Sequence, residues 1–207
     1  MRWSGWPKAL GTNLLKNLLF FILFCLLCSW QNALCVELIE VTVVVEDGRY
    51  RVFGQSRIDA SPEFVYATLI DYDNFHKLAD GIAESKYLPP DQSGNLLAYT
   101  RFESCVMVFC KTIEKVEQIS GEPHDSIHVL AIPNLSDFTY NESSWRIENS
   151  GTATLLTYES EFEPDFWIPP LIGPWAVRRK LIQTAELIGS RIEWMQTRGL
   201  TLAQVHE

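Results

Sequence analysis

The feature that most constrains this fold is one long amphipathic helix at the end of an otherwise strand-like chain. On a wheel of 100° per residue, the apolar side chains of residues 174–195 share one broad face. Pro174 suits the first turn, where no backbone hydrogen bond is lost, and Gly199 suits the end of the helix. The apolar stripe contains Val177, Leu181, Ile182, Ala185, Ile188, Gly189, Ile192 and Met195. Because this stripe must be buried, we expect a sheet wrapped around the helix.

Residues 37–163 consist of short strand-like runs separated by turn residues. Asp47-Gly48 between two such runs predicts a β-hairpin. Ser61 followed by Pro62 predicts a short capped helix, and Asn74 can begin a second one. Short connections predict antiparallel neighbours among the later strands. These strands are expected at Ser85–Leu88, Leu96–Cys105, Cys110–Ile119, Ser126–Ile132, Phe138–Glu148 and Thr152–Phe162.

Three stretches in this order resemble the START-like, or SRPBCC, superfamily, and within it the polyketide cyclase/dehydrase and coenzyme-Q-binding branch. They are residues 58–66 (IDASPEFVY), 69–75 (LIDYDNF) and 168–172 (IPPLI). The resemblance covers roughly residues 50–199. It implies an α+β helix-grip fold, in which a curved antiparallel sheet of about seven strands wraps around the long C-terminal helix. Two short helices would follow the first strand, and a cavity for a hydrophobic ligand would lie between sheet and helix.

The N-terminal 35 residues are expected to be a signal peptide or an N-terminal membrane anchor ahead of a START-like domain at 36–207. Basic residues precede a 13-residue apolar run at 18–30, which is short for a spanning helix of about 20 residues. Ala33 and Cys35 suit signal cleavage, while an uncleaved anchor and acylation of Cys35 are the alternatives. We therefore expect an exported protein, periplasmic or secreted, that this segment could also hold at a membrane.

The charge and motif content of the chain exclude several classes of function. A net charge of −9 argues against nucleic acid as a partner and against broad attraction to anionic lipid. The four histidines lack metal-ligand spacing, and no phosphate loop, nucleophile elbow or zinc signature is present. Asp71 and Asp73 are better explained as turn residues than as paired catalytic carboxylates. We therefore predict no catalytic residue, no metal and no cofactor, and we regard an enzyme as the less favoured case.

Cys105 and Cys110 are the only cysteines after residue 35. In an exported protein such a pair suggests a disulfide. If the segment is a hairpin, the bond would close a turn whose apolar tip meets a membrane or covers the cavity mouth. If it is one continuous buried strand, the two thiols point to opposite faces and stay free. The tip residues are Val106, Met107, Val108 and Phe109.

Side chains expected to line the cavity are those on the inward side of each predicted element, and a one-residue register error would move a strand residue to the other face. They are Phe75, Tyr99, Trp145, Tyr158, Phe162, Leu181, Ala185 and Ile188. Arg178 falls within the helix stripe, where it could pair with an anionic head group or rest at the cavity edge with its head in water. A membrane or cavity rim, or else ordinary packing of the helix start, would involve Trp167, Ile168, Leu171 and Trp175.

The sequence thus favours an exported binding or carrier module for a hydrophobic small molecule, which gains about 25 cal/mol per Å² of apolar surface buried. The resemblance implies a lipid or an isoprenoid quinone as the ligand, and a membrane surface is a second expected partner. One alternative is an enzyme of the polyketide cyclase/aromatase type, with a few polar groups in an apolar pocket. The absence of a clear acid/base set counts against it. The other alternative is a membrane-tethered interaction domain without a ligand.

Overall fold

The computed structural model describes residues 36–106, 109–170 and 172–205. The predictions for residues 1–35, and those for Met107, Val108 and Leu171, lie outside the described residues. No helix within the described ranges is both long and apolar enough to cross a membrane.

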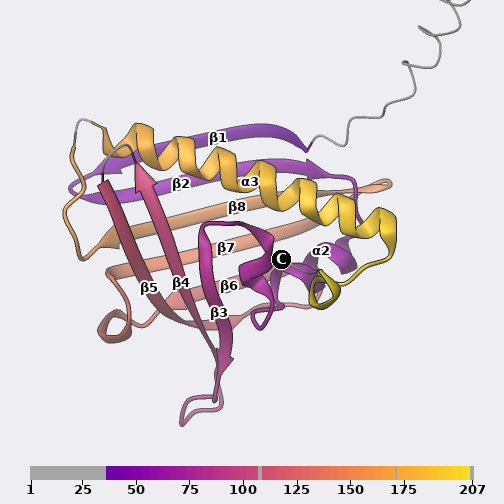
Figure 1. Cartoon of the computed structure of the whole chain (residues 1–207), viewed down its shortest axis with the longest axis horizontal. Helices are drawn as coiled ribbons and strands as arrows, with labels where there is room; N and C mark the ends of the chain where they lie inside the picture. The colour runs from indigo at the N-terminus through magenta and orange to yellow at the C-terminus, as the bar shows by residue number, and fades with distance from the viewer. Residues whose placement is uncertain (1–35, 107–108, 171, 206–207) are drawn as a thin grey trace, which may run out of the picture. The chain divides into compact units, whose positions relative to one another are not determined.

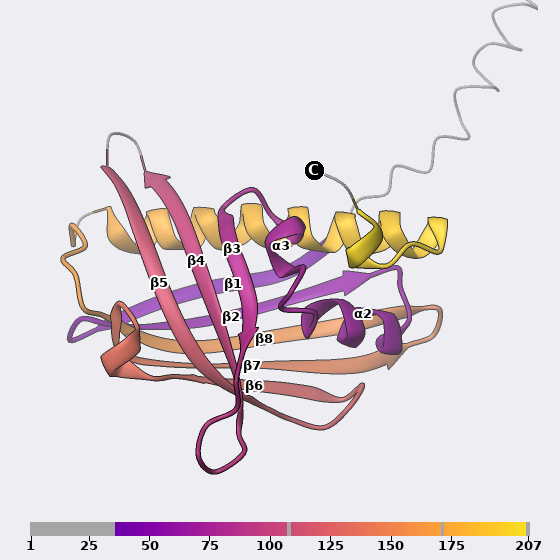
Figure 2. The ribbon, with the colours of Figure 1, turned by 60° about the horizontal axis from the view of Figure 1, so that its bottom comes forward.

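The described strands form one antiparallel sheet in the order β1-β2-β8-β7-β6-β5-β4-β3 (Figure 1). The sheet curves, and β3, β4 and β5 cross steeply over the direction of β6, β7 and β8 (Figure 2). The predicted α+β helix-grip class is confirmed, with eight strands among the described residues. The strands are β1 Glu37–Glu46, β2 Arg49–Ile58, β3 Ile82–Leu88, β4 Leu96–Val106, β5 Phe109–Ser120, β6 Ser126–Ala131, β7 Phe138–Ser150 and β8 Ala153–Pro164.

The connections follow the turn chemistry of the sequence. Asp47 and Gly48 both have positive φ, 51° and 84°, which is the conformation of a type I′ hairpin turn. Helix α2 (Pro62–Leu69) starts at Ser61, whose Oγ accepts a hydrogen bond from the Phe64 amide at 3.3 Å. The second predicted short helix is a single 3₁₀ turn, η1 (Phe75–Leu78). A last 3₁₀ turn, η3, covers Leu202–Gln204.

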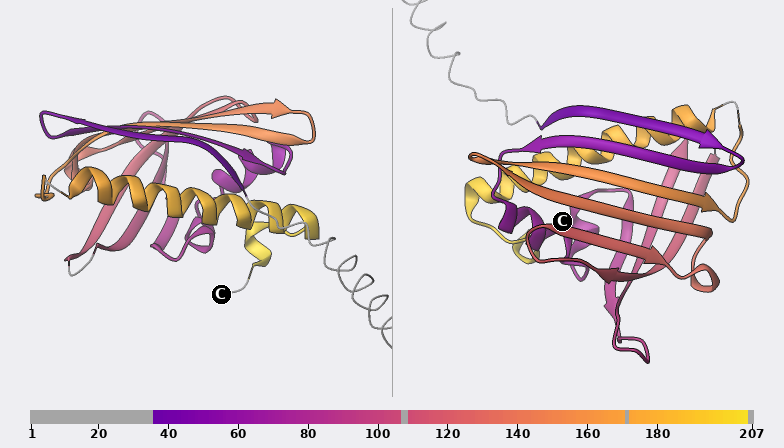
Figure 3. Two further views of the ribbon diagram at one scale, coloured as in Figure 1. Left: turned by 90° about the horizontal axis from the view of Figure 1, so that it is seen from above. Right: turned by 180° about the vertical axis from the view of Figure 1, so that it is seen from behind.

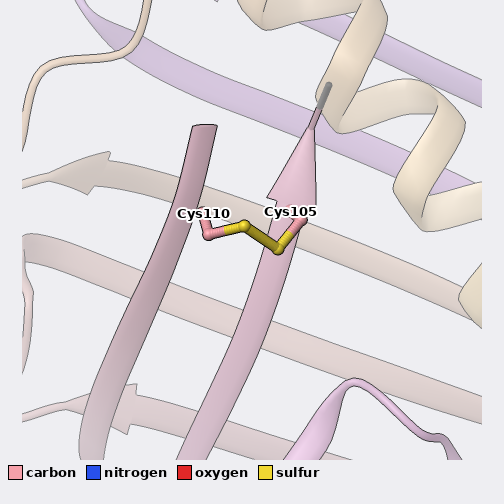
Figure 4. Close-up of a disulfide and its surroundings, with 2 residues drawn as sticks. All are labelled: Cys105 and Cys110. Atoms are coloured by element: carbon pink, nitrogen blue, oxygen red, sulfur yellow. A yellow bond between two sulfur atoms is a disulfide. The ribbon is translucent and has the colours of Figure 1, made fainter. Parts of the chain in front are cut away.

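Strands β4 and β5 form a hairpin, so the alternative of one continuous strand is wrong. The two strands pair directly from Leu96 with Ile119 to Val106 with Phe109. Cys105 stands opposite Cys110 in this register, and a disulfide joins their sulfur atoms (Figure 4).

Helix α3 (Gly173–Arg198) lies across the concave face of the sheet (Figure 3). It ends at Gly199, which adopts the left-handed conformation with φ 61°. The stripe of α3 is buried unevenly: Ile192 and Met195 are fully buried, while Leu181 and Ile188 are half-buried. The last turns of the helix therefore close a packed core, and its middle faces a less completely filled space.

The packed core contains buried residues of α2, η1, α3, η3 and most strands of the sheet. Val65 of α2 and Leu78 of η1 meet Ile58 of β2 there, and each is at most 1% exposed. This core holds the sheet and α3 together, and some of its residues, such as Leu69 and Tyr72, also line a cavity next to it.

Candidate ligand cavity

A cavity of about 370 Å³ lies between the concave face of the sheet and residues 180–189 in the middle of α3. This volume falls within the range of small-molecule sites. Its wall is mostly apolar and draws on every strand except β6, as well as on α2, η1 and α3. Apolar lining residues include Leu38, Val52, Ile82, Phe102, Ile113 and Leu156.

Most of the side chains predicted for the cavity lie in its wall. The rings of Trp145 on β7 and Tyr158 on β8 pack with their centroids 5.0 Å apart. Three half-buried residues of α3 form the facing wall. The predicted residues that line the cavity are Phe75, Trp145, Tyr158, Leu181, Ala185 and Ile188.

Tyr99 does not line the cavity, because the inward face of β4 is one residue out of step with the predicted one. Its hydroxyl donates a hydrogen bond to Glu114 at 2.9 Å, and the ammonium of Lys86 lies 5.1 Å from its ring centroid. The neighbouring Thr100 points into the cavity instead. Since side chains alternate between the faces of a strand, this shift of one residue exchanges the two positions.

Phe162 and Arg178 also lie outside the cavity lining, for different reasons. Phe162 stacks on Tyr50 with ring centroids 5.1 Å apart, and Phe138 lines the cavity instead of Phe162. Arg178 is exposed, and its Nε donates to the backbone oxygen of Val41 at 3.2 Å. Arg178 thus has no position from which to meet a ligand head group inside the cavity.

The entry to α3 carries the predicted rim residues that the structure describes. Trp167 is 74% exposed and Trp175 is 52% exposed. Ile168 is half-buried, and a Cβ on Gly173 would lie only 2.7 Å from its side chain. The ammonium of Lys111, near the turn of the β4–β5 hairpin, lies 5.1 Å from the ring centroid of Phe166, so hairpin and entry segment are neighbours. Val106 and Phe109 end β4 and begin β5.

The cavity meets solvent next to this entry segment. Lys180 lines the cavity and is exposed, and its Nζ lies 3.3 Å from the Cβ position of Gly81. Gly81, just before β3, also lines the cavity. The exposed part of the cavity wall therefore lies where Lys180 of α3 passes Gly81, just before β3.

Sequence reasoning missed a polar cluster in the wall, which we name the wall cluster: Tyr72, Thr100, Lys115 and Glu117. The Tyr72 hydroxyl donates to Glu117 Oε1 at 2.9 Å. Lys115 Nζ lies 2.5 Å from Glu117 Oε2, and their side chains are only 12% and 3% exposed. Burial, with the adjacent Glu117 carboxylate, raises the pKa of Tyr72 well above its usual value, so its hydroxyl keeps its proton at neutral pH.

Strand β5 carried a signal for this cluster. Lys115 and Glu117 alternate in phase with Ile113 and Ile119, two apolar residues of the same face. Glu114 and Gln118 on the other face are polar as well. Both faces of the strand therefore contain charged residues, and alternation alone does not show that one pair is buried.

Residues 49–200 match the model of a protein family described as polyketide cyclase / dehydrase and lipid transport. No curated protein matches the chain significantly.

Several solved structures share the fold at low sequence identity. A START superfamily protein from Mycobacterium smegmatis is 17% identical, with a TM-score of 0.58 over 70% of this chain and 98% of that one. A STAR-related lipid transfer protein from Xanthomonas axonopodis is 15% identical, with a TM-score of 0.56 over 73% and 98%. The Zhui aromatase/cyclase from Streptomyces sp. R1128 is 13% identical, with a TM-score of 0.51 over 76% and 99%. These likenesses show a shared fold, and they do not single out the coenzyme-Q-binding branch.

Proposed function

The chain belongs to the polyketide cyclase/dehydrase and lipid transport family, and from this premise we propose that it is an exported binding or carrier module for a hydrophobic small molecule. The observation that carries the proposal is the apolar cavity of about 370 Å³ under α3. A lipid or an isoprenoid quinone has the required apolar body. The solved lipid transfer protein and aromatase/cyclase share only the fold, so the choice between carrier and enzyme rests on the cavity.

The uneven burial of the apolar side chains of α3 supports a ligand in the cavity. Leu181, Ala185 and Ile188 face the cavity and remain half-buried, whereas Ile192 and Met195 are fully buried. An apolar ligand would remove the remaining surface of the first three from water, at about 25 cal/mol per Å². The cavity thus offers a driving force for binding without any covalent chemistry.

The cargo is tested by expressing the full chain, purifying the protein and extracting it with organic solvent for mass spectrometry. We expect one apolar molecule per protein chain. A protein that is recovered folded and without any extractable molecule, and that also binds no added lipid or quinone, would contradict the carrier function.

Export is supported by the disulfide, because such bonds persist in oxidising compartments. The intact mass of the natural protein tests this directly. We expect a mass two hydrogen atoms below that of the reduced form, and a chain that begins after the N-terminal segment or still carries it as an anchor. Two free thiols in the natural protein would count against export.

A membrane surface is the place where such a module would exchange its cargo, and the entry to α3 supports this role. Trp167 and Trp175 are exposed in the segment that leads into α3, and tryptophan is enriched at membrane interfaces. The adjacent Arg178, Arg179 and Lys180 are exposed, and residues 166–185 contain no acidic residue in a chain of net charge −9. This local positive charge fits an anionic lipid surface although the whole protein is acidic.

Co-sedimentation with vesicles tests the membrane role. We expect the protein to bind vesicles of mixed anionic and neutral lipid, and Trp167→Ala/Trp175→Ala to weaken binding about tenfold. The matched control is Leu135→Ala, another exposed apolar residue located on the η2 turn (Pro133–Leu135). Equal loss in both variants, or no binding by the unaltered protein, would remove the membrane role and leave the cavity proposal in place.

A cyclase/aromatase-type enzyme is the second candidate, and the wall cluster is the observation that favours it. Tyr72 keeps a proton next to Glu117 inside an apolar cavity, which is a setting in which polar groups can steer a reactive chain. Incubation with a linear poly-β-ketone distinguishes the two functions. In the presence of a carrier the compound cyclises at its uncatalysed rate. An enzyme accelerates the cyclisation, and the Glu117→Gln variant should not.

A further inference from the structure

Thr100 has a hydroxyl group that the fold leaves without a partner. The residue is 1% exposed and lines the cavity. Its Oγ1 has no hydrogen-bond partner among the residues that the structure describes. Buried hydroxyl groups are nearly always hydrogen-bonded, since an unmade bond costs stability. An oxygen atom supplied from the cavity would satisfy this group.

Lys115 supplies an unused hydrogen-bond donor at the same point of the wall. Thr100 and Lys115 are direct cross-strand partners on β4 and β5, which places their side chains next to each other. The Lys115 ammonium lies 2.5 Å from Glu117 Oε2 and 3.4 Å from Asn141 Oδ1. Because an ammonium has three N–H donors, one remains for a ligand.

The charge of the wall cluster decides which oxygen fits. The negative charge of Glu117 balances the positive charge of Lys115. An anionic head group would be attracted by the ammonium but repelled by the carboxylate at short range. The other basic residue of the cavity, Lys180, lies at the opening. A neutral oxygen can accept from Lys115 and share a hydrogen bond with Thr100 without this repulsion. Hydroxyl and carbonyl groups have that chemistry.

We propose that Thr100 and Lys115 form a subsite for a neutral hydroxyl or carbonyl group on an otherwise apolar ligand. The subsite rests on the proposed cavity function and narrows its cargo. Alcohols, phenols, quinols and ketones fit it, whereas free fatty acids and ligands with a phosphate in the cavity do not. Its selectivity comes from hydrogen bonds that the apolar wall cannot offer.

Three matched naphthalene probes test the subsite on protein obtained by expressing the full chain. The hydroxyl of 2-naphthol replaces the methyl group of 2-methylnaphthalene at nearly equal size, and 2-naphthoate adds a negative charge. Binding is followed by the fluorescence of each probe. We expect 2-naphthol to bind at least as tightly as the methyl compound despite its stronger hydration, and 2-naphthoate to bind at least about tenfold more weakly than 2-naphthol.

Thr100→Val is the decisive variant, because it removes the unpartnered hydroxyl at nearly constant shape. It should weaken 2-naphthol binding about five- to tenfold and change 2-methylnaphthalene binding less than twofold. Thr112→Val is the control, since Thr112 is an exposed residue of β5. It should leave both affinities unchanged.

Weaker binding of 2-naphthol than of 2-methylnaphthalene would overturn the subsite while the cavity function stands. So would 2-naphthol binding that Thr100→Val leaves unchanged. Tighter binding of 2-naphthoate than of 2-naphthol would overturn the preference for a neutral group. If none of the probes binds, the subsite falls together with the cavity function on which it rests.

Discussion

At the scale of single residues, the buried ion pair in the cavity wall carries a large desolvation cost. Lys115 and Glu117 have side chains 12% and 3% exposed, and the Tyr72 hydroxyl donates to the carboxylate. Taking two charges out of water costs several kcal/mol per ion, and their attraction roughly offsets that cost. Such a pair adds little stability over apolar residues of equal volume, so its presence at the cavity is better explained by what it can bind.

This reasoning predicts unequal effects of single and paired substitution. Lys115→Met should lower the free energy of unfolding by about 3–5 kcal/mol, because Glu117 stays buried without a counter-charge. Lys115→Met/Glu117→Leu should recover most of that loss. Urea denaturation of the two variants measures the difference. A double variant as unstable as the single one would show that the pair itself holds the fold.

Glu193 predicts a pH dependence of stability. It is 2% exposed and accepts a hydrogen bond from the Asp59 amide at 2.9 Å. Burial raises its pKa above the usual value, while the Asp59 hydrogen bond acts in the opposite direction. The folded state therefore favours the protonated carboxyl. Its contribution to stability is present below about pH 4, where the unfolded chain is protonated too, and is lost as the pH rises through the raised pKa.

Glu193→Gln keeps an acceptor for Asp59 and removes the charge. We expect this variant to be more stable than the natural protein at pH 7 and equally stable near pH 4. Glu186→Gln, on the exposed side of the same helix, should show no such gain. Thermal unfolding across this pH range gives the comparison, and a variant that is less stable at pH 7 would show that the charge is needed.

At the scale of elements, the sequence predicts the helices and strands well because their signals are local. Asp47-Gly48 adopts the turn expected of it, and α3 ends at Gly199. Which face of a strand looks inward is a tertiary property. In β4, apolar and aromatic residues occur on both faces, so nothing local distinguishes Tyr99 from Thr100. Phe162 lies on the inward face as predicted, yet its stacking on Tyr50 beyond the cavity depends on a neighbouring strand.

Helix α3 approaches the start of the described chain closely at Gly189. A Cβ there would lie 2.5 Å from Val36 Cγ2, and Val36 is buried. Gly189→Ala should gain about 1 kcal/mol of helix propensity and lose more through overpacking, about 1–3 kcal/mol. The net result is a less stable protein.

Val36→Ala removes the Val36 Cγ atoms that a Cβ at position 189 would meet, so it tests whether overpacking causes the loss of stability. In the Val36→Ala background, Gly189→Ala should become neutral or stabilising. Denaturation of the four variants in a double-mutant cycle measures this coupling. A coupling energy near zero would mean that the helix can move away from Val36 at no cost.

At the scale of the whole molecule, the packed core and the cavity adjoin each other between the sheet and α3. The core joins sheet and helix, and some of its residues, such as Leu69 and Tyr72, also line the cavity. Along α3, residues 180–189 contribute to the cavity wall, whereas Ile192 and Met195 nearer its C-terminal end are fully buried. The last turns of α3 therefore hold the fold while its middle serves the ligand.

The most direct test of this account fills the cavity without touching the core. Ala185→Trp places a large side chain into the cavity from α3, and Gln183→Trp places the same side chain on the exposed side of the helix. Saturable 1:1 binding of 2-methylnaphthalene is measured by fluorescence titration, with circular dichroism as the check on folding. We predict that Ala185→Trp loses at least about tenfold in affinity while folded, and that Gln183→Trp binds like the natural protein. Equal binding by both variants would contradict a ligand site between the sheet and α3.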